Sequence, residues 1–310
     1  MNAKQSSTEV TRIIPKNGNE KLEGFYLAPP LLSEISEKLG RSILLINFVT
    51  DINGVIATKN DKGYFVPPRQ ITNPYDWRLF QELAAQADAL ITSGKYLTGF
   101  AKGRTTQNFL TQFESSGKFS QLGNWRLKKG YGKISPDIVV PSRSLNITIP
   151  DVLVKSKRKI LIYTMGSMIS SPEAKFLRGS GANLEIIEAG TTDGTGVDGK
   201  AMTSNLESKG YRVVKIITGP SVLQILLDAN VIDRIYITQV QRSVSETNPE
   251  NFKKVLAGGG KVEDLAGFTL VQKYEQIGVK VDDGERVNQH FLIFESDKFK
   301  AERENHNIRI

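Results

Sequence analysis

The feature of this chain that most constrains its fold is an alternation of short apolar runs with polar, helix-forming segments from residue 41 onward. The runs are rich in Ile, Val and Leu, and turn-forming residues flank them. Continuous apolar runs of this kind are typical of strands buried on both faces. We predict strands at residues 43–49, 89–92, 138–140, 160–164, 184–188, 213–218 and 234–239.

Helical patterns separate several of these strands. Residues 76–86 place Trp77, Phe80 and Leu83 on one face, and residues 221–228 carry apolar side chains at the same spacing. Apolar residues three to four positions apart indicate a helix that packs one face against a core. Strands that alternate with helices predict an α/β fold with parallel neighbouring strands.

The C-terminal part of the chain follows another pattern. Residues 269–274 and 291–294 are typical of strands, and between them lie the turn-forming residues Asp282, Asp283 and Gly284. Such a sequence predicts an antiparallel hairpin, added here at the edge of the sheet. The predicted fold class is therefore α/β, with a mixed, mostly parallel sheet flanked by helices and an antiparallel C-terminal hairpin.

The domain organisation is predicted to be simple. Residues 1–40 start with a polar stretch and are interpreted as an N-terminal extension, and residues 41–310 as one domain. Within that domain, residues 103–135 are the least regular segment, with Lys and Arg interleaved with aromatic residues. We interpret them as an irregular insertion packed on the domain or a mobile lid. The same composition can also bind single-stranded nucleic acid.

The residue types present narrow the chemistry that the chain can perform. It has no cysteine and only two histidines, His290 and His306. This excludes thiol nucleophiles and cysteine zinc sites, and it disfavours a metal cluster or a serine–histidine triad. Reactions whose chemistry resides in a cofactor fit such a chain. The net charge of +8 favours a phosphate-bearing ligand or nucleic acid, although solubility alone also explains it.

No apolar run reaches membrane-spanning length, and the first 20 residues do not form a secretory signal. We expect a cytoplasmic protein with no membrane partner and no metal site.

Three strand ends carry polar or glycine residues that could bind a ligand. Gly219 and Pro220 lie between a strand and a helix, where backbone N–H groups and the positive helix end favour an anion. Gly94 follows another strand, where a small residue would let a dinucleotide lie across the strand end. Both segments could equally be plain turns.

The third strand end carries Asn47, Thr50, Asp51 and Asn53. Their side chains could hydrogen-bond the edge of a heterocycle or a carboxamide, or satisfy the backbone of the turn.

Taken in order, these segments resemble the pyrimidine reductase family of the riboflavin pathway, whose fold is dihydrofolate-reductase-like. Residues 47–54 read Asn-Phe-Val-Thr-Asp-Ile-Asn-Gly, where the family has Asn-Phe-Val-Ala-Ser-Leu-Asp-Gly. Residues 87–94 are similar to its Ala-Asp-Ala-Ile-Leu-x-Gly motif, and residues 136–143 to its next strand. Residues 218–233 contain Thr-Gly-Pro-Ser-Val-Leu, similar to the family's Gly-Gly-Pro-Thr-Leu. The order of these motifs supports the resemblance more strongly than any one of them.

The resemblance implies a stand-alone, homodimeric reductase that binds NADPH and a flat heterocycle, by default 5-amino-6-(5-phosphoribosylamino)uracil. The zinc deaminase domain of bifunctional members needs cysteines that this chain lacks. The catalytic positions would be Asp51 and Asn53, and the substrate-binding positions Asn47 and Gln70. The implied cofactor contacts are Val49 and Thr50 near the nicotinamide, Gly94 and Tyr96 along the cofactor, Ser142 near the adenosine, and Gly219, Pro220, Ser221 and Val222 at the pyrophosphate.

The chain departs from the family mainly on the substrate side. Asn53 replaces an aspartate, Gln70 a tryptophan, Ala84 an arginine and Ile217 an acidic residue, while Asp51 replaces a serine. The arginine matters most, because a bidentate guanidinium–phosphate contact has no easy replacement. The departures leave open a non-catalytic protein that retains the fold and the nucleotide site.

Overall fold

The computed structural model describes residues 9–15, 19–105, 108–245, 248–256 and 259–309. The chain forms two compact units. Unit 1 contains residues 1–39, 45–83 and 232–310, and unit 2 contains residues 40–44 and 84–231.

Unit 2 contains five parallel strands, in agreement with the predicted apolar runs. In spatial order the strands are β10 (Val213–Ile216), β6 (Ala89–Ile91), β7 (Asp137–Pro141), β8 (Ile160–Thr164) and β9 (Leu184–Glu188). Every residue of β10, β6, β7 and β8 is buried, which explains why those segments are mostly apolar.

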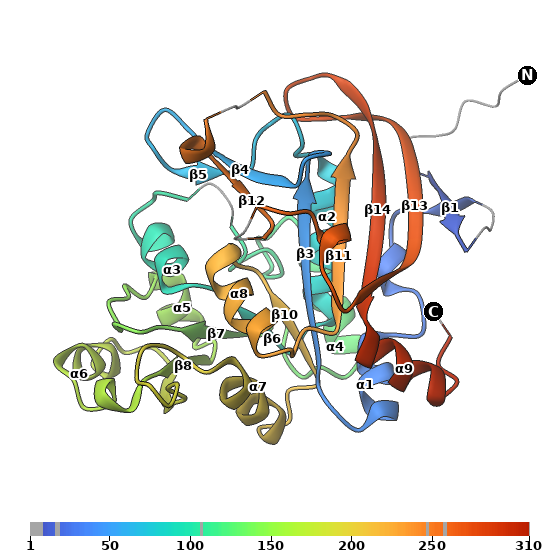
Figure 1. Cartoon of the computed structure of the whole chain (residues 1–310). Helices are drawn as coiled ribbons and strands as arrows, with labels where there is room; N and C mark the ends of the chain where they lie inside the picture. Colours follow the sequence, from blue (N-terminus) through green and yellow to red (C-terminus); the bar gives the residue numbers. More distant parts are fainter. Residues whose placement is uncertain (1–8, 16–18, 106–107, 246–247, 257–258, 310) are drawn as a thin grey trace, which may run out of the picture. The chain divides into compact units, whose positions relative to one another are not determined.

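Helices connect the strands of unit 2, as Figure 1 shows. The predicted helix 221–228 is confirmed and begins one residue earlier, at a proline. The helices are α3 (Gly94–Ala101), α4 (Ser120–Lys128), α5 (Asp151–Ser156), α6 (Pro172–Arg178), α7 (Gly199–Ser208) and α8 (Pro220–Asp228), with a 3₁₀ turn, η2, at Gly166–Met168.

The segment 103–135, of which residues 106 and 107 lie outside the described part, is held by two buried arginines. Nη1 of Arg126 donates to the carbonyl oxygens of Ala85, at 2.8 Å, and Ala87. Nη1 of Arg158 donates to the Leu110 carbonyl oxygen at 2.8 Å. Burial lowers the pKa of each guanidinium to about 10. Phe113 and Phe119 in this segment are buried, so their rings pack in unit 2 and present no stacking surface for a nucleic-acid base.

The main sheet of unit 1 is mostly antiparallel. Its strands are, in spatial order, β2 (Asn19–Lys21), β1 (Glu9–Ile14), β13 (Phe268–Lys280), β14 (Arg286–Ser296), β11 (Arg234–Val240) and β3 (Ile43–Thr50). Only the β11–β3 pair among these is parallel. Figure 1 shows the predicted C-terminal hairpin, β13 and β14, beside β11.

The prediction that this hairpin forms the sheet edge is wrong. β1 pairs with β13, with Thr11 opposite Glu275, and β2 continues the sheet beyond β1. The N-terminal residues therefore supply two further strands. No strand was predicted in either segment: β2, Asn-Glu-Lys, is short and polar, and β1, Glu-Val-Thr-Arg-Ile-Ile, pairs with β13, which lies far away in the sequence.

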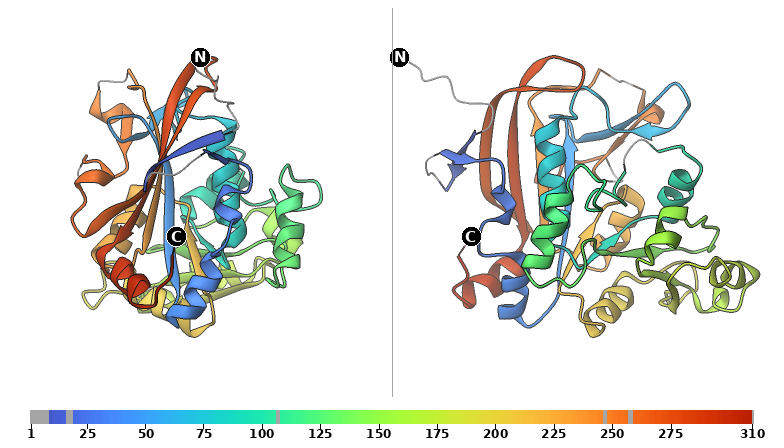
Figure 2. Two further views of the ribbon diagram at one scale, coloured as in Figure 1. Left: turned by 90° about the vertical axis from the view of Figure 1, so that its right-hand side faces the viewer. Right: turned by 180° about the vertical axis from the view of Figure 1, so that it is seen from behind.

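The helices of unit 1 include one that lies along its main sheet. Figure 2 shows α2 lying along one face of β3 and β11. Its first turn is capped by Asn73, whose Oδ1 accepts hydrogen bonds from the amides of Tyr75 at 3.1 Å and Asp76 at 3.0 Å. The helical segments of unit 1 include η1 (Phe25–Leu27), α1 (Leu32–Leu39), α2 (Pro74–Gln86), whose last three residues belong to unit 2, and α9 (Asp297–Asn305).

Unit 1 also contains a small antiparallel sheet that the sequence patterns did not indicate. Its strands are β12 (Phe252–Lys254), β4 (Val55–Lys59) and β5 (Phe65–Val66). Short 3₁₀ turns, η3 (Pro249–Asn251) and η4 (Val262–Asp264), flank β12. This sheet joins the segment after β11 to the segment after β3.

Candidate functional site

The carboxyl ends of three neighbouring strands in unit 2 bring the predicted nucleotide-binding segments to one edge. The amide of Thr92, after β6, donates to the Val139 carbonyl oxygen of β7 at 2.8 Å. The amide of Ile217, after β10, donates to the Ile91 carbonyl oxygen of β6 at 2.8 Å. Ser142 follows β7 directly. Such an edge of a parallel sheet is where α/β proteins commonly bind ligands.

At this edge of the sheet, Gly219 has free space beside its Cα. It is the N-cap of α8, is exposed, and has φ −79° and ψ −177°, which any residue can adopt. A Cβ added there would meet no described atom within 4 Å. Among the described residues no side chain caps this helix, and Pro220 occupies its first turn. The backbone N–H groups in the first turn of α8 can therefore donate hydrogen bonds to a bound anion. Ser221 is exposed beside them, whereas Val222 is buried.

At Gly94, close packing of the protein explains why the residue is glycine. A Cβ at this position would lie 2.7 Å from Cγ1 of Ile147. The helix that it opens, α3, is capped by Ser93, whose Oγ accepts a hydrogen bond from the Tyr96 amide at 3.1 Å. The close packing against Ile147 accounts for Gly94 without any ligand.

Two other predicted cofactor residues have partners within unit 2. The hydroxyl of Tyr96 accepts a hydrogen bond from the Phe109 amide at 3.0 Å, and burial raises the pKa of this tyrosine. Oγ of Ser142 accepts one from the Leu145 amide at 3.1 Å. Their contact with a cofactor stays a prediction.

In unit 1, Asp51 organises the turn after β3. Its side chain is fully buried. Oδ1 accepts hydrogen bonds from the amides of Asn53 and Val55, each at 2.8 Å, and Oδ2 accepts one from the Val244 amide at 3.0 Å. A carboxylate that accepts three backbone hydrogen bonds stabilises its turn and uses most of its acceptor sites. Asp51 therefore links the turn after β3 to the segment after β11.

The other predicted substrate-side residues are less constrained. Asn53 donates from Nδ2 to Oγ of Ser243 at 2.8 Å in an exposed position. Asn47 on β3 is half-buried, and its Oδ1 is buried without a hydrogen-bond partner among the described residues. An orphaned buried acceptor of this kind is rare in a folded protein and suits a ligand-binding role. Gln70 is half-buried before α2, and Val49 packs against an apolar cluster that contains Val240.

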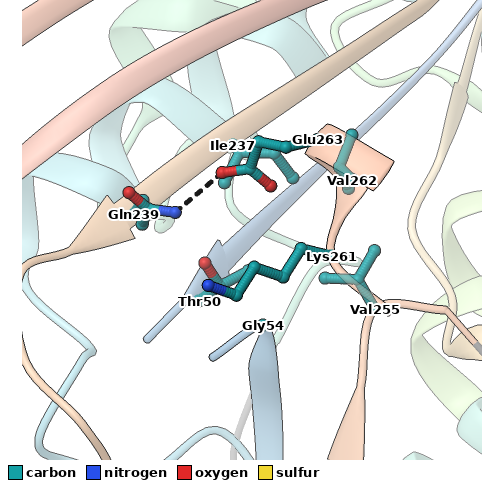
Figure 3. A pocket seen from close by; sticks show the side chains of 8 residues that line it. All are labelled: Thr50, Gly54, Ile237, Gln239, Val255, Lys261, Val262 and Glu263. Carbon is teal, nitrogen blue, oxygen red and sulfur yellow. Dashed lines mark hydrogen bonds between the residues drawn. The ribbon is translucent and has the colours of Figure 1, made fainter. Parts of the chain in front are cut away.

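A small pocket of about 10 Å³ lies at the end of β3, with room for roughly one water molecule. Glu263 accepts a hydrogen bond from Nε2 of Gln239 at 2.9 Å across it, as Figure 3 shows. Lys261 passes close to Gly54, since a Cβ on that glycine would lie 3.7 Å from Cγ of Lys261. The lining residues are Thr50, Gly54, Ile237, Gln239, Val255, Lys261, Val262 and Glu263.

The sequence patterns gave no indication of Gln239, Lys261 or Glu263. Gln239 reaches the end of β3 because β11 pairs with β3, with Gln239 opposite Thr50. Lys261 and Glu263 follow β12, which pairs with β4, and the Val255 amide donates to the Gly54 carbonyl oxygen at 3.0 Å. Such long-range pairing of short segments has no local sequence signal.

The parallel strands, flanking helices and antiparallel hairpin define an α/β protein, and the predicted fold class is confirmed. Residues 42–242 match the family described as the RibD C-terminal domain. This match covers more than half of the chain, and the chain belongs to that family.

Solved structures share the fold. A pyrimidine reductase-like protein from Corynebacterium diphtheriae is 18% identical, with a TM-score of 0.56, and the match covers 89% of this chain and 98% of that one. A diaminohydroxyphosphoribosylaminopyrimidine deaminase/5-amino-6-(5-phosphoribosylamino)uracil reductase from Thermotoga maritima is 13% identical, with a TM-score of 0.50. The second match covers 83% of this chain and 57% of that one. None of the curated protein sequences compared with the chain matches it significantly.

The described residues contain no helix that is long and apolar enough to cross a membrane. They also contain no group of three or more His, Asp or Glu side chains placed to hold a metal ion.

Proposed function

We propose that the protein is an NADPH-dependent reductase of a pyrimidine or related heterocycle, with 5-amino-6-(5-phosphoribosylamino)uracil as the first substrate to test. The observation that supports this most strongly is the open N-terminus of α8 at Gly219, in a chain of the RibD C-terminal domain family. A cytoplasmic location and a homodimeric state belong to the same proposal.

The residues of the unit 2 edge fit a dinucleotide. Gly219 leaves space for the pyrophosphate to approach the backbone closely. The amides of α8 together with Ser221 would bind it. Bound NADPH would supply the hydride. The protein's part is then to bind and orient the two reactants.

On the substrate side, Asn47 is the residue best suited to contact a heterocycle. Its amide can both donate and accept, and its Oδ1 has no partner among the described residues. Gln70 is a second candidate contact. Asp51 would act by fixing the turn that carries Asn53, since three backbone amides already donate to its oxygens.

A titration with NADPH and with NADH, followed by nicotinamide fluorescence, tests the cofactor site. We expect NADPH to bind, and Gly219→Asp to weaken it by about tenfold or more, because a carboxylate would occupy the anion position. Gly196→Asp is the matched control, since that glycine of unit 2 also has open space around it. No binding of either nucleotide, or equal weakening in both variants, would refute the proposed cofactor site.

A second candidate is a non-catalytic protein that binds the nucleotide on the same fold. The small pocket at the end of β3 and the three backbone amides that already donate to Asp51 favour it. NADPH oxidation in the presence of the uracil substrate separates the two, because this candidate predicts tight NADPH binding with no turnover of any pyrimidine.

A further inference from the structure

A buried charge cluster in unit 1 connects α9 to the sheet. Glu295 on β14 is fully buried and accepts hydrogen bonds from two guanidinium groups. Nη2 of Arg234 lies 2.6 Å from its Oε1, and Nε of Arg303 lies 3.0 Å from its Oε2. Two cations thus share one buried carboxylate.

A cavity of about 320 Å³ opens beside Arg303, at the start of β13. This volume is in the range of small-molecule sites. The cavity is lined by Arg12, Pro15, Thr269, Leu270, Val271, Lys300, Arg303 and Glu304.

The lining is predominantly basic. Arg12, Lys300 and Arg303 contribute cations, and Glu304 contributes the one carboxylate of the lining. Glu304 is a weak counterion, because its Oε1 lies 3.7 Å from Nη2 of Arg303 and its side chain is 56% exposed. The guanidinium of Arg12 packs over the Tyr274 ring at 5.6 Å, which holds it at the cavity.

The remaining walls suit the non-ionic part of a ligand. Pro15, Leu270 and Val271 are apolar. The β13–β14 register shifts between Leu270 and Gln272, so the pairing with β14 skips Val271. Bulges of this kind leave backbone groups available for other contacts.

We propose that this cavity is a binding site for a soluble, phosphorylated small molecule. Lys300 and Arg303 would bind the phosphoryl group, and the apolar wall would contact the rest of the ligand. Lys300 and Arg303 both line the cavity, Arg303 is at least nine-tenths buried, and Lys and Arg are the side chains that proteins commonly use to bind phosphate. The site lies wholly within unit 1, whereas the proposed pyrophosphate contacts belong to unit 2.

Site-resolved lysine acetylation tests the proposal on the unaltered protein. Acetylation of Lys300 and of Lys298 is followed by peptide mass spectrometry, with and without pyrophosphate and at matched ionic strength. Lys298 is the internal control, because it lies on the same helix, is 65% exposed and does not line the cavity.

Pyrophosphate at ten times its Kd should slow acetylation of Lys300 by about tenfold and leave Lys298 unchanged. Equal slowing of both lysines, or no slowing of either, would overturn the proposal. The protection should persist in Gly219→Asp, since that substitution affects only the proposed cofactor site. Loss of Lys300 protection in Gly219→Asp would also overturn it, by attributing the effect to the unit 2 edge.

Discussion

The strand ends of the two units carry similar turn-forming residues. They differ in how many of their backbone amides donate to a side chain. In unit 2, the turn at Gly219 leaves the first amides of α8 without a side-chain cap among the described residues. In unit 1, the turn after β3 is closed by Asp51, whose carboxylate takes three backbone amides.

This difference separates residues that maintain a turn from residues that are available to a ligand. Gly219 has open space around it, whereas Gly94, at the end of the neighbouring strand, is required by Ile147. Glycine at a strand end is therefore insufficient evidence of a ligand site. The atoms around the position that a Cβ would occupy show whether the glycine leaves room for a ligand or allows close packing of the protein.

The largest expected effect is that of Asp51→Ala. Removing the carboxylate leaves the buried amides of Val55 and Val244 without acceptors, which should destabilise the protein by about 3 kcal/mol in urea unfolding. Asn53→Ala in the same turn should change stability by less than about 1 kcal/mol, because its bond to Ser243 is exposed. If Asp51→Ala instead kept full stability and lost reductase turnover, Asp51 would be catalytic and the comparison would fail.

Next in size is Gly94→Ala. The added methyl group would overlap Ile147, and we expect a loss of about 1–2 kcal/mol in urea unfolding, with recovery in the double variant with Ile147→Ala. Gly219→Ala is the matched comparison and should change stability by less than about 0.5 kcal/mol. Equal destabilisation by the two glycine substitutions would show that the space at Gly219 is not open.

Tyr96→Phe should have a smaller effect, of about 1 kcal/mol, because the Phe109 amide loses its acceptor. Amide hydrogen exchange of residues 108–128 should accelerate while the Kd for NADPH stays the same. The opposite result, a weaker Kd with unchanged exchange, would assign Tyr96 to the cofactor.

The smallest effect is expected for Glu263→Ala, which removes an exposed hydrogen bond to Gln239. Stability should change by less than about 0.5 kcal/mol, and the Kd for NADPH should be unaltered if unit 2 supplies the pyrophosphate contacts. A tighter Kd would indicate instead that the segment at η4 limits access to the end of β3. Glu250→Ala, at an exposed position in η3, is the control.

The secondary structure of unit 2 was largely predictable from the sequence. Its strands at 160–164 and 184–188 match the predicted bounds, and the other three differ by no more than two residues at either end. Strands buried on both faces must be apolar throughout, so each run is a strong local signal. In unit 1, β2 and β12 are three residues long and mostly polar, and β1 and β12 pair with residues far away in the chain.

The candidate site was predictable only in part. The sequence alone determined the fold class, the family resemblance and the positions of Gly94, Gly219 and Asp51 at strand ends, because these follow from local patterns and motif order. The tertiary structure decided what each residue does: Ile147 explains Gly94, open space distinguishes Gly219, and the Val244 amide engages Asp51. Contacts between residues far apart in the chain have no local signature, and therefore only the folded protein reveals them.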